Sequence, residues 1–343
     1  MKEPPTSNPT PDPVLLRDLG EWELLRRLSA YAPPGQFDDD AALLNEQSGR
    51  QLVVNTDVLV EGVHFSDATI GPRDLGWRAA AANLSDLAAM GCTSVAGLTV
   101  ALVAPGDTPW SWVEGVYDGF SEALAHHGGV LLGGDCSSGS QRLLSITALG
   151  HLSPGCAIRR GDGRPGDWLV SSGPHGLSRL GLALLLDQLQ PSQAAALSPE
   201  LREQAIRAHR RPQPRLDVVA ALHRSQPPGQ AWRVGGTDSS DGLAAAVRAL
   251  AAASGCSAQL QRSTLPLEPS LAQLEQGEAW CLGGGEDFEL VLALEPGWAE
   301  TLMAAQPGMR HIGCLQAGAA GEVFWQESGD PLGEASTGFT HFR

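Results

Sequence analysis

Short acidic clusters are the residues of this chain best suited to chemistry, and several lie beside glycine or serine where a strand pattern ends. Sites in α/β folds are built at such positions. Carboxylates gathered at one place repel one another and stay partly protonated at neutral pH unless cations neutralise them, and hard cations such as Mg²⁺ choose oxygen ligands. If the clusters converge, they predict a metal site for nucleotide phosphates, since Mg²⁺ often shares its coordination with phosphate oxygens. The clusters are Asp38–Asp40, Thr56–Asp57, Asp86, Gly133–Asp135, Asp238–Asp241 and Gly284–Asp287.

Lysine is almost absent, because Lys2 is the only one among 343 residues. A P-loop lysine, or the strand lysine of a protein kinase, therefore cannot exist here. A kinase built from this chain must neutralise a polyphosphate with several metal ions, backbone N–H groups and arginine. The net charge of −16 also argues against non-specific attraction to nucleic acid or to an anionic membrane.

The length of the chain exceeds what one hydrophobic core usually organises, so we expect two domains. The Pro-rich residues 1–13 lack the apolar core of a signal peptide and are expected to be disordered. No later stretch is long and apolar enough to span a bilayer. The six cysteines form no C-x-x-C pair, which favours free thiols over a zinc site or a disulfide framework. We expect a cytoplasmic protein.

Hydrophobic spacing predicts that residues 14–153 form one α/β domain. The helix after Pro72 should bury Trp77, Ala81, Leu84 and Ala88. Two of the strands are expected to end in polar groups, at Asn55–Asp57 and at Gly133–Asp135, where a site is plausible. The expected helices are 14–31, 73–90 and 110–126, and the expected strands are 52–54, 95–103, 130–132 and 143–149.

Residues 154–343 are predicted to form a second α/β domain, which begins with a Gly-, Pro- and Arg-rich boundary at 154–165. Strands are expected at 168–171, 287–294 and 323–325. The expected helices are 177–189, 199–208, 215–224 and one opened by 238–242 that continues to 253. No solenoid repeat is visible.

Seven motifs occur in the order in which they occur in thiamine-monophosphate kinases, and the chain resembles that family from about Asp38 to His341. Each motif alone is short, but the ordered set is specific. The motifs are Asp39–Ala42, Asn55–Phe65, Asn83–Gly91, Gly133–Asp135, Pro165–Asp167, Asp238–Leu243 and Gly284–Leu290.

The resemblance implies a two-domain fold of the aminoimidazole-ribonucleotide-synthetase-like ATP-binding superfamily, α/β of the α+β type. An N-terminal domain would bind ATP and Mg²⁺ and form a homodimer by sheet pairing, and a C-terminal domain would complete the cleft. It also implies the reaction, in which ATP and thiamine monophosphate give ADP and thiamine diphosphate in the last step of thiamine diphosphate biosynthesis.

Site residues also follow from the resemblance, position by position. The residues linked to several Mg²⁺ ions would be Asp40, Thr56, Asp57, Asp86, Asp135, Asp238 and Asp241, of which Asp57, Asp86, Asp135 and Asp241 are most critical. The ATP residues would be Tyr117, Gly134, Asp135, Arg160 and Ser240. Thiamine monophosphate would contact His64, Glu286 and Phe339.

The metal residues have structural alternatives. The run that contains Asp40 is also typical of a solvated acidic turn, and Asp238 and Asp241 could cap the helix that follows them. Asp86 is harder to explain without a cation, because an unpaired carboxylate in that apolar helix would be costly.

The ligand residues have alternatives too. Arg160 could be a surface arginine, Tyr117 a packing residue, and His64 a residue that satisfies a turn. Glu286 could face the cationic thiazolium or the aminopyrimidine, and Phe339 could stack on a ring or be a hydrophobic tail residue that packs with Phe342.

The chain departs from the family pattern at several positions. Asn55 replaces a hydroxyl residue that can serve one metal, and Cys136 follows Asp135 where a hydroxyl residue is usual. Asp38 stands at a usual glycine, and Ser239 stands at a usual apolar residue. None of these changes removes a predicted carboxylate.

A phosphate acceptor is already anionic at neutral pH, so the transfer needs no strong general base. We therefore expect direct in-line transfer without a covalent enzyme intermediate. Two alternatives remain: a sister enzyme of the superfamily that uses ATP on another substrate, and a non-catalytic module that binds cation or nucleotide.

Overall fold

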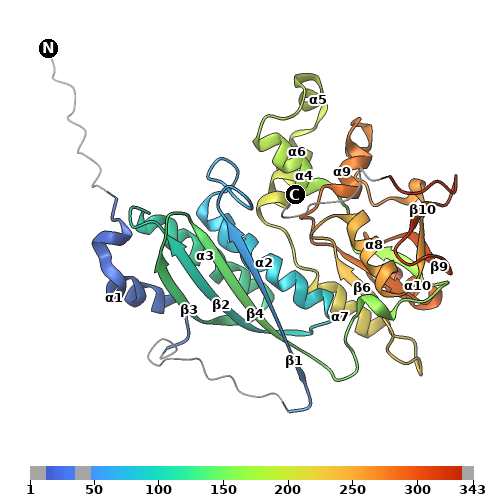
Figure 1. The fold of residues 1–343 in the computed structure, drawn as a ribbon, viewed down its shortest axis with the longest axis horizontal. Coiled ribbons are helices and arrows are strands. Elements are labelled where there is room, and N and C mark those ends of the chain that lie inside the picture. The colour runs from blue at the N-terminus through green and yellow to red at the C-terminus, as the bar shows by residue number, and fades with distance from the viewer. Residues whose placement is uncertain (1–12, 35–47, 334–343) are drawn as a thin grey trace.

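The structure is a computed structural model that describes residues 13–34 and 48–333. Asp38, Asp40 and Phe339, and nearly all of the Pro-rich tail, lie outside the described residues. Two sheets organise the described chain, one in each half (Figure 1). Among the described residues, no helix combines the length and the apolar character needed to cross a membrane.

The first half is a four-stranded sheet in the order β1-β4-β2-β3, with one face covered by helices (Figure 1). The strands are β1 (Gln51–Val60), β2 (Ser94–Ala104), β3 (Val130–Ser138) and β4 (Leu143–Leu152). The helices are α1 (Leu16–Leu28), α2 (Pro72–Ala89) and α3 (Trp110–His127), and a 3₁₀ turn, η1 (Ser29–Tyr31), follows α1. Alternate residues of β4, Leu144, Ile146 and Ala148, are fully buried beneath the helices, as the two-residue period of a strand requires.

The opposite face of this sheet is open in the described chain. Leu52, Val54 and Val58 of β1 are 57%, 63% and 43% exposed on it. This face therefore exposes apolar side chains, and none of the helices at residues 13–34 and 48–333 covers it.

The second half is a six-stranded sheet in the order β10-β7-β9-β5-β8-β6, with a hydrophobic core on each face. Leu169 and Val170 are adjacent in β5 but belong to different cores, so helices cover both faces. The strands are β5 (Trp168–Ser171), β6 (Gly235–Asp238), β7 (Ser257–Leu260), β8 (Leu290–Leu294), β9 (Arg310–Gln316) and β10 (Val323–Trp325). The helices are α4 (Leu177–Leu185), α5 (Pro191–Ala196), α6 (Pro199–Arg210), α7 (Leu216–Ser225), α8 (Leu243–Ala253), α9 (Gly277–Gly283) and α10 (Pro296–Ala305), with 3₁₀ turns η2 (Arg160–Asp162), η3 (Arg262–Thr264) and η4 (Leu271–Gln273).

The two-domain α/β prediction is confirmed, and the predicted face of α2 is buried as expected. Two strand ends were predicted wrongly. β1 continues through Asn55–Asp57 and β3 continues through Gly133–Asp135, because both segments stay paired with a neighbouring strand. The polar residues therefore lie within strands rather than after them.

Several boundaries in the second half also differ from the prediction. The helix expected to reach residue 189 ends at Leu185, and Asp187 after it has a left-handed φ of 51°. The strand expected from residue 287 starts at Leu290, because Glu286 and Phe288 are in the left-handed region. Strands β6, β7 and β9 and helices α5, α9 and α10 had not been predicted, and Asp238 ends β6 rather than opening the helix α8.

Candidate active site

Helix α2 and strand β1 bring together the first group of site residues. The Asn55 side-chain amide donates to Asp86 Oδ2 at 2.8 Å and to Asn83 Oδ1 at 3.2 Å. Asn83 Oδ1 also accepts from the backbone N–H of Asp57 at 3.2 Å, and its own amide donates to the carbonyl of Ala79 at 2.9 Å. The fully buried Asn83 thus ties α2 to β1 and places Asp57 beside Asp86.

The second half contributes a third carboxylate to the same place. Asp238, at the end of β6, is 6% exposed, and its Oδ2 accepts from Ser85 of α2 at 2.8 Å. Arg160 in η2 donates from Nε to Thr237 Oγ1 at 3.1 Å, and its charge is close enough to act on both Asp86 and Asp238. The site therefore lies where α2 meets β6.

These carboxylates repel one another in a partly desolvated place. Burial first, and then the charges of Asp238 and Asp57, raise the pKa of Asp86 to about 7. Burial also raises the pKa of Asp57, against the opposing charge of His64, and it raises the pKa of Asp238. A cation at this place would favour the ionised form of all three.

The donor set fits a hard divalent cation that keeps other ligands. Within residues 13–34 and 48–333, no three His, Cys, Asp or Glu side chains lie close enough to hold a metal by themselves. Asn55 Oδ1 is buried and has no hydrogen-bond partner. Carboxylates supplemented by an amide oxygen, water and substrate phosphates are typical Mg²⁺ surroundings.

Two predicted substrate residues border this carboxylate group. Nδ1 of His64 accepts from the backbone N–H of Val60 at 3.0 Å, so the turn after β1 orients the ring. Burial acts to raise the pKa of Glu286, but Arg78, His209 and His64 together lower it, so the carboxylate is ionised. Its side chain is 38% exposed, and its backbone N–H donates to the carbonyl of Ser240 at 2.7 Å. His64 thus acts on both Asp57 and Glu286.

Thr56 and Asp135 are not brought to this group within one chain. Thr56 alternates with Asn55 and Asp57, and its hydroxyl hydrogen-bonds Thr147 at 2.8 Å on the open face of the sheet. Asp57 belongs to a row of paired residues that crosses the sheet through Ile146, Val100 and Gly134, and this row faces the helices. Asp135 follows Gly134 in β3, and successive side chains of a strand point to opposite faces, so Asp135 points to the open face as well. β3 is three strand spacings from β1, about 14 Å.

The structure places the other predicted ATP-binding residues in the first core, within a strand and beside Asp238. Tyr117 is 3% exposed and packs in the first core between Tyr31 and Phe120, with ring centroids 5.6 and 5.8 Å away. A Cβ on Gly134 would lie 1.8 Å from the carbonyl oxygen of Val100, so close strand packing requires this glycine. Ser240 donates to Asp238 Oδ1 at 3.4 Å, and Asp241 is exposed at the turn that follows.

Two departures from the family pattern have structural explanations. Ser239 is 1% exposed and hydrogen-bonds the fully buried His175 at 2.9 Å, so a hydroxyl suits this position. Cys136 packs against the first core beneath the helices.

Sequence reasoning missed three residues that hold the site together: Asn83, Ser85 and Arg78. All three are polar side chains on α2 at 3% exposure or less. A charged or amide side chain inside such an apolar helix is a detectable signal, because burial without a partner is costly.

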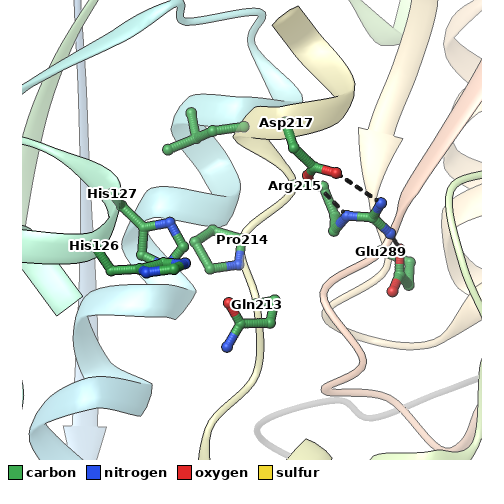
Figure 2. Close-up of a pocket in the computed structure, with 8 residues that line it drawn as sticks. His126, His127, Gln213, Pro214, Arg215, Asp217 and Glu289 are labelled. Atoms are coloured by element: carbon green, nitrogen blue, oxygen red, sulfur yellow. Dashed lines mark hydrogen bonds and ion pairs between the residues drawn. The ribbon is translucent and has the colours of Figure 1, made fainter. Parts of the chain in front are cut away.

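A separate hollow of about 610 Å³ lies between the end of α3 and the segment before α7 (Figure 2). His126 and His127 line one side, and Arg215, Asp217 and Glu289 line the other. None of the predicted site residues that the structure describes lines it. Arg215 bridges Asp217 and Glu289, as the dashed lines in Figure 2 show.

Comparison with known proteins identifies the family. Residues 38–152 match the N-terminal domain of AIR synthase related proteins, and residues 164–326 match the C-terminal domain. The thiamine-monophosphate kinase of Prochlorococcus marinus is 47% identical over 330 residues, covering 96% of this chain and 97% of the relative. The chain belongs to the thiamine-monophosphate kinase family.

Other thiamine-monophosphate kinases are similar to this chain in sequence and in structure. That of Synechococcus elongatus is 50% identical over 84% of this chain and 86% of the relative. The crystal structure of the Stenotrophomonas maltophilia thiamine-monophosphate kinase superposes with a TM-score of 0.75 at 32% identity, covering 90% of this chain and 96% of that one. AaThiL complexed with AMPPCP and TMP has a TM-score of 0.72 at 28% identity, covering 95% and 98%.

Proposed function

We propose that this enzyme transfers the γ-phosphoryl group of ATP to thiamine monophosphate and releases ADP and thiamine diphosphate. The observation that carries the proposal is the convergence of Asp57, Asp86 and Asp238 from both halves beside Arg160, with Glu286 and His64 at its border. Family membership and the AaThiL complex with AMPPCP and TMP support it.

Magnesium is the cation we propose for the carboxylate group. Asp57, Asp86 and Asp238 would hold it, with Asp241 and Asn55 Oδ1 as further oxygen donors. When bound, it would neutralise the phosphate charge. Ser85 orients Asp238, and Asn55 orients Asp86, so α2 and β1 hold two of these carboxylates in place before any ligand arrives.

Arg160 is proposed to bind the ATP phosphates, because its guanidinium lies beside the carboxylates and is anchored only through Nε in the contacts described. On the acceptor side, the ionised Glu286 suits a cationic ring or an amino group, and His64 suits the monophosphate. The anionic acceptor oxygen can attack directly, so alignment and charge neutralisation would carry the catalysis. No protein nucleophile is proposed.

A homodimer would complete the site. The open face carries the exposed apolar residues Leu52, Val54 and Val58 together with Thr56 and Asp135. Apolar surface of this kind is typical of an interface. Asp135 is about three strand spacings from Asp57 in its own chain. We therefore propose that sheet pairing brings Asp135 of one copy toward the carboxylates of its partner.

We also propose that the enzyme works in the cytoplasm. All six cysteines are free, and Cys92, Cys256 and Cys281 are buried. Unpaired thiols in this number suit a reducing compartment.

The test is a purified-enzyme assay with ATP, Mg²⁺ and thiamine monophosphate in which the mono- and diphosphate are separated. Controls with EDTA and without acceptor accompany it. Metal-dependent formation of thiamine diphosphate would support the proposal. ATP hydrolysis without that product would point to a sister enzyme, and nucleotide binding without turnover would point to a non-catalytic module.

A further inference from the structure

The loop that carries Glu286 has an unusual backbone. Gly285, Glu286 and Phe288 have φ values of 68°, 59° and 53°. Side chains other than glycine adopt this region at a cost, and such strain persists only where surrounding contacts impose it. The acidic side chains of the same loop make contacts that anchor it on both sides.

Two of these acidic side chains have partners within the second half. Asp287 accepts from the backbone N–H groups of Gly176 at 2.7 Å and Ser178 at 3.0 Å, at the start of α4. Glu289 pairs with Arg215, whose Nη1 also donates to the carbonyl of Ser172 at 2.9 Å. The third, Glu286, pairs with Arg78 of α2 in the first half.

Arg78 is itself rigidly held. Its side chain is only 3% exposed, and its Nη1 donates to the backbone carbonyl of His209 at 2.7 Å. The His209 ring lies 3.2 Å from the same nitrogen and 3.3 Å from Ser178 Oγ. Burial first, and then Arg78, lower the pKa of His209 to about 3, so the imidazole is neutral and can accept from the guanidinium.

The pair is asymmetric in a way that suits recognition. Arg78 is enclosed, whereas Glu286 is 38% exposed. A carboxylate has room for more than one hydrogen bond, so the Arg78 contact leaves acceptor capacity for a ligand. The titratable and charged groups around Glu286 are Arg78 from α2, the neutral His209 from α6, His64 from the turn after β1, and Asp287 from its own loop.

We infer that Arg78 is a positioning residue for the phosphoryl acceptor: through its contact with Glu286 it holds that carboxylate ionised and correctly placed for a cationic or amino-bearing ring. The inference rests on the proposed function for the identity of the acceptor. It adds that α2, which carries Asp86, also sets the acceptor subsite, so one helix of the first half aligns metal and acceptor.

The experiment compares Arg78→Gln, Arg78→Lys, Glu286→Gln and the double variant Arg78→Gln/Glu286→Gln in the full chain. Arg211→Gln is the matched control, because Arg211 also links α6 to α2 through Asp74 but does not contact Glu286. Steady-state constants are measured for both substrates, and binding of thiamine monophosphate is measured by calorimetry without ATP. Thermal unfolding of each variant is recorded.

We expect Arg78→Gln to raise the KM for thiamine monophosphate about tenfold or more, with a smaller change in the KM for ATP. Arg78→Lys should recover part of that loss, because lysine keeps the positive charge but lacks the planar guanidinium with its paired hydrogen-bond donors. The KM for thiamine monophosphate in the double variant should be no higher than in Glu286→Gln alone, since the two residues act through one contact.

A pH profile separates positioning from general damage. Without Arg78, burial should raise the pKa of Glu286, so the KM of Arg78→Gln relative to wild type should increase as the pH falls from 8 toward 5. That ratio should stay flat for Glu286→Gln and for Arg211→Gln.

Three results would overturn the inference. The first is a KM for thiamine monophosphate in Arg78→Gln that equals the KM in Arg211→Gln. The others are a KM in the double variant that reflects the sum of both single losses, and a KM in Arg78→Lys that recovers none of the loss. If Arg78→Gln does not fold, the KM and the binding of thiamine monophosphate in Arg78→Lys and Glu286→Gln still test the inference. A wild-type enzyme that makes no thiamine diphosphate would instead refute the proposed function, whatever the variants do.

Discussion

Two acidic regions of this molecule are built in opposite ways. Asp57, Asp86 and Asp238 approach one another from β1, α2 and β6, with neutral hydrogen-bond donors and one arginine close by. Glu286, Asp287 and Glu289 belong to one loop, and each has its own arginine or backbone N–H partners. The first region has one arginine beside three carboxylates and calls for an added cation, whereas each carboxylate of the second has partners from the protein itself. Burial still raises the pKa of Asp287 to about 7 and raises that of Glu289, so these partners offset only part of the cost of burial.

The comparison predicts different consequences for removing a carboxylate. In the uncompensated group the carboxylate serves the ligand, so its loss should abolish activity while the fold tolerates it. In the second loop the buried Glu289 serves its partner, so removing one side of that pair should first destabilise the fold, whereas the part-exposed Glu286 also serves the acceptor. The predictions below test this division, from the largest expected effect to the smallest.

Asp57→Asn should lower kcat by about a thousandfold or more, because it removes charge from the proposed metal site. The thermal midpoint without Mg²⁺ should be unchanged or higher, since burial already raises the pKa of Asp57 and disfavours its charge. Activity assays at saturating Mg²⁺ and thermal unfolding check both parts. Asp107→Asn, in an exposed turn, is the matched control, and wild-type activity in Asp57→Asn would refute the site assignment.

Arg215→Gln should destabilise the fold by about 3 kcal/mol, because it leaves Glu289 buried without its cation. Both side chains of this pair, shown in Figure 2, are at most 15% exposed. Urea unfolding measures the free energy. The control is Arg262→Gln, whose partner Glu278 is 42% exposed and whose loss should cost less than about 1 kcal/mol. Equal losses in the two variants would contradict the division drawn above.

The pH dependence of stability provides a third test. Because the folded-state pKa of Asp86 is raised to about 7, the metal-free fold binds an extra proton that the unfolded chain releases near pH 4. The free energy of unfolding should therefore fall as the pH rises from about 4 to about 7, by on the order of 4 kcal/mol from this group. Unfolding is measured in EDTA at pH 5 and 8.

Asp86→Asn should remove the part of that slope that Asp86 contributes, whereas buried Asp287, whose pKa is also raised to about 7, keeps its own part. Mg²⁺ should stabilise the wild-type protein more at pH 8 than at pH 5. A slope that is as steep in Asp86→Asn as in wild type would assign it to other groups. A Mg²⁺ effect independent of pH would argue against metal binding by this carboxylate.

Much of this division was visible in the sequence. Proline at the start of α2, its apolar spacing and the ordered motifs predicted the helix and placed Asp57, Asp86 and Asp238 in one site. Local patterns mark polarity but not pairing, so they wrongly ended β1 and β3 at their polar residues. The pairing that continues both strands depends on distant partners in β4 and β2.

The alternation of side chains along a strand also explains why the motif order did not show which face of the sheet each residue occupies. Thr56 lies between Asn55 and Asp57 in one motif, yet a strand sends it to the opposite face. Arg78 was missed for the reverse reason. Its significance comes from Glu286, which is 208 positions later in the chain, and only the packing of α2 against the second half brings the two together.

The smallest expected effect concerns Asn55, where this chain departs from its family. Its amide donates to Asp86, which directs the buried Oδ1 away from that carboxylate with no partner of its own. If Oδ1 is a metal ligand, Asn55→Thr should change the Mg²⁺ affinity only a few-fold, because a hydroxyl oxygen replaces an amide oxygen. Asn55→Leu should weaken it about tenfold and should also raise the pKa of Asp86 further, since a lowering hydrogen bond is lost.

Calorimetric titration with Mg²⁺ in the presence of a non-hydrolysable ATP analogue measures these affinities, and Val58→Thr, on the open face of the same strand, controls for changes to β1. Equal affinities in Asn55→Leu and wild type would remove Asn55 from the metal site and leave it as a support for Asp86. A loss in Asn55→Leu that Asn55→Thr largely restores would show that an oxygen, and not the amide donor, is what the uncompensated region requires at this position.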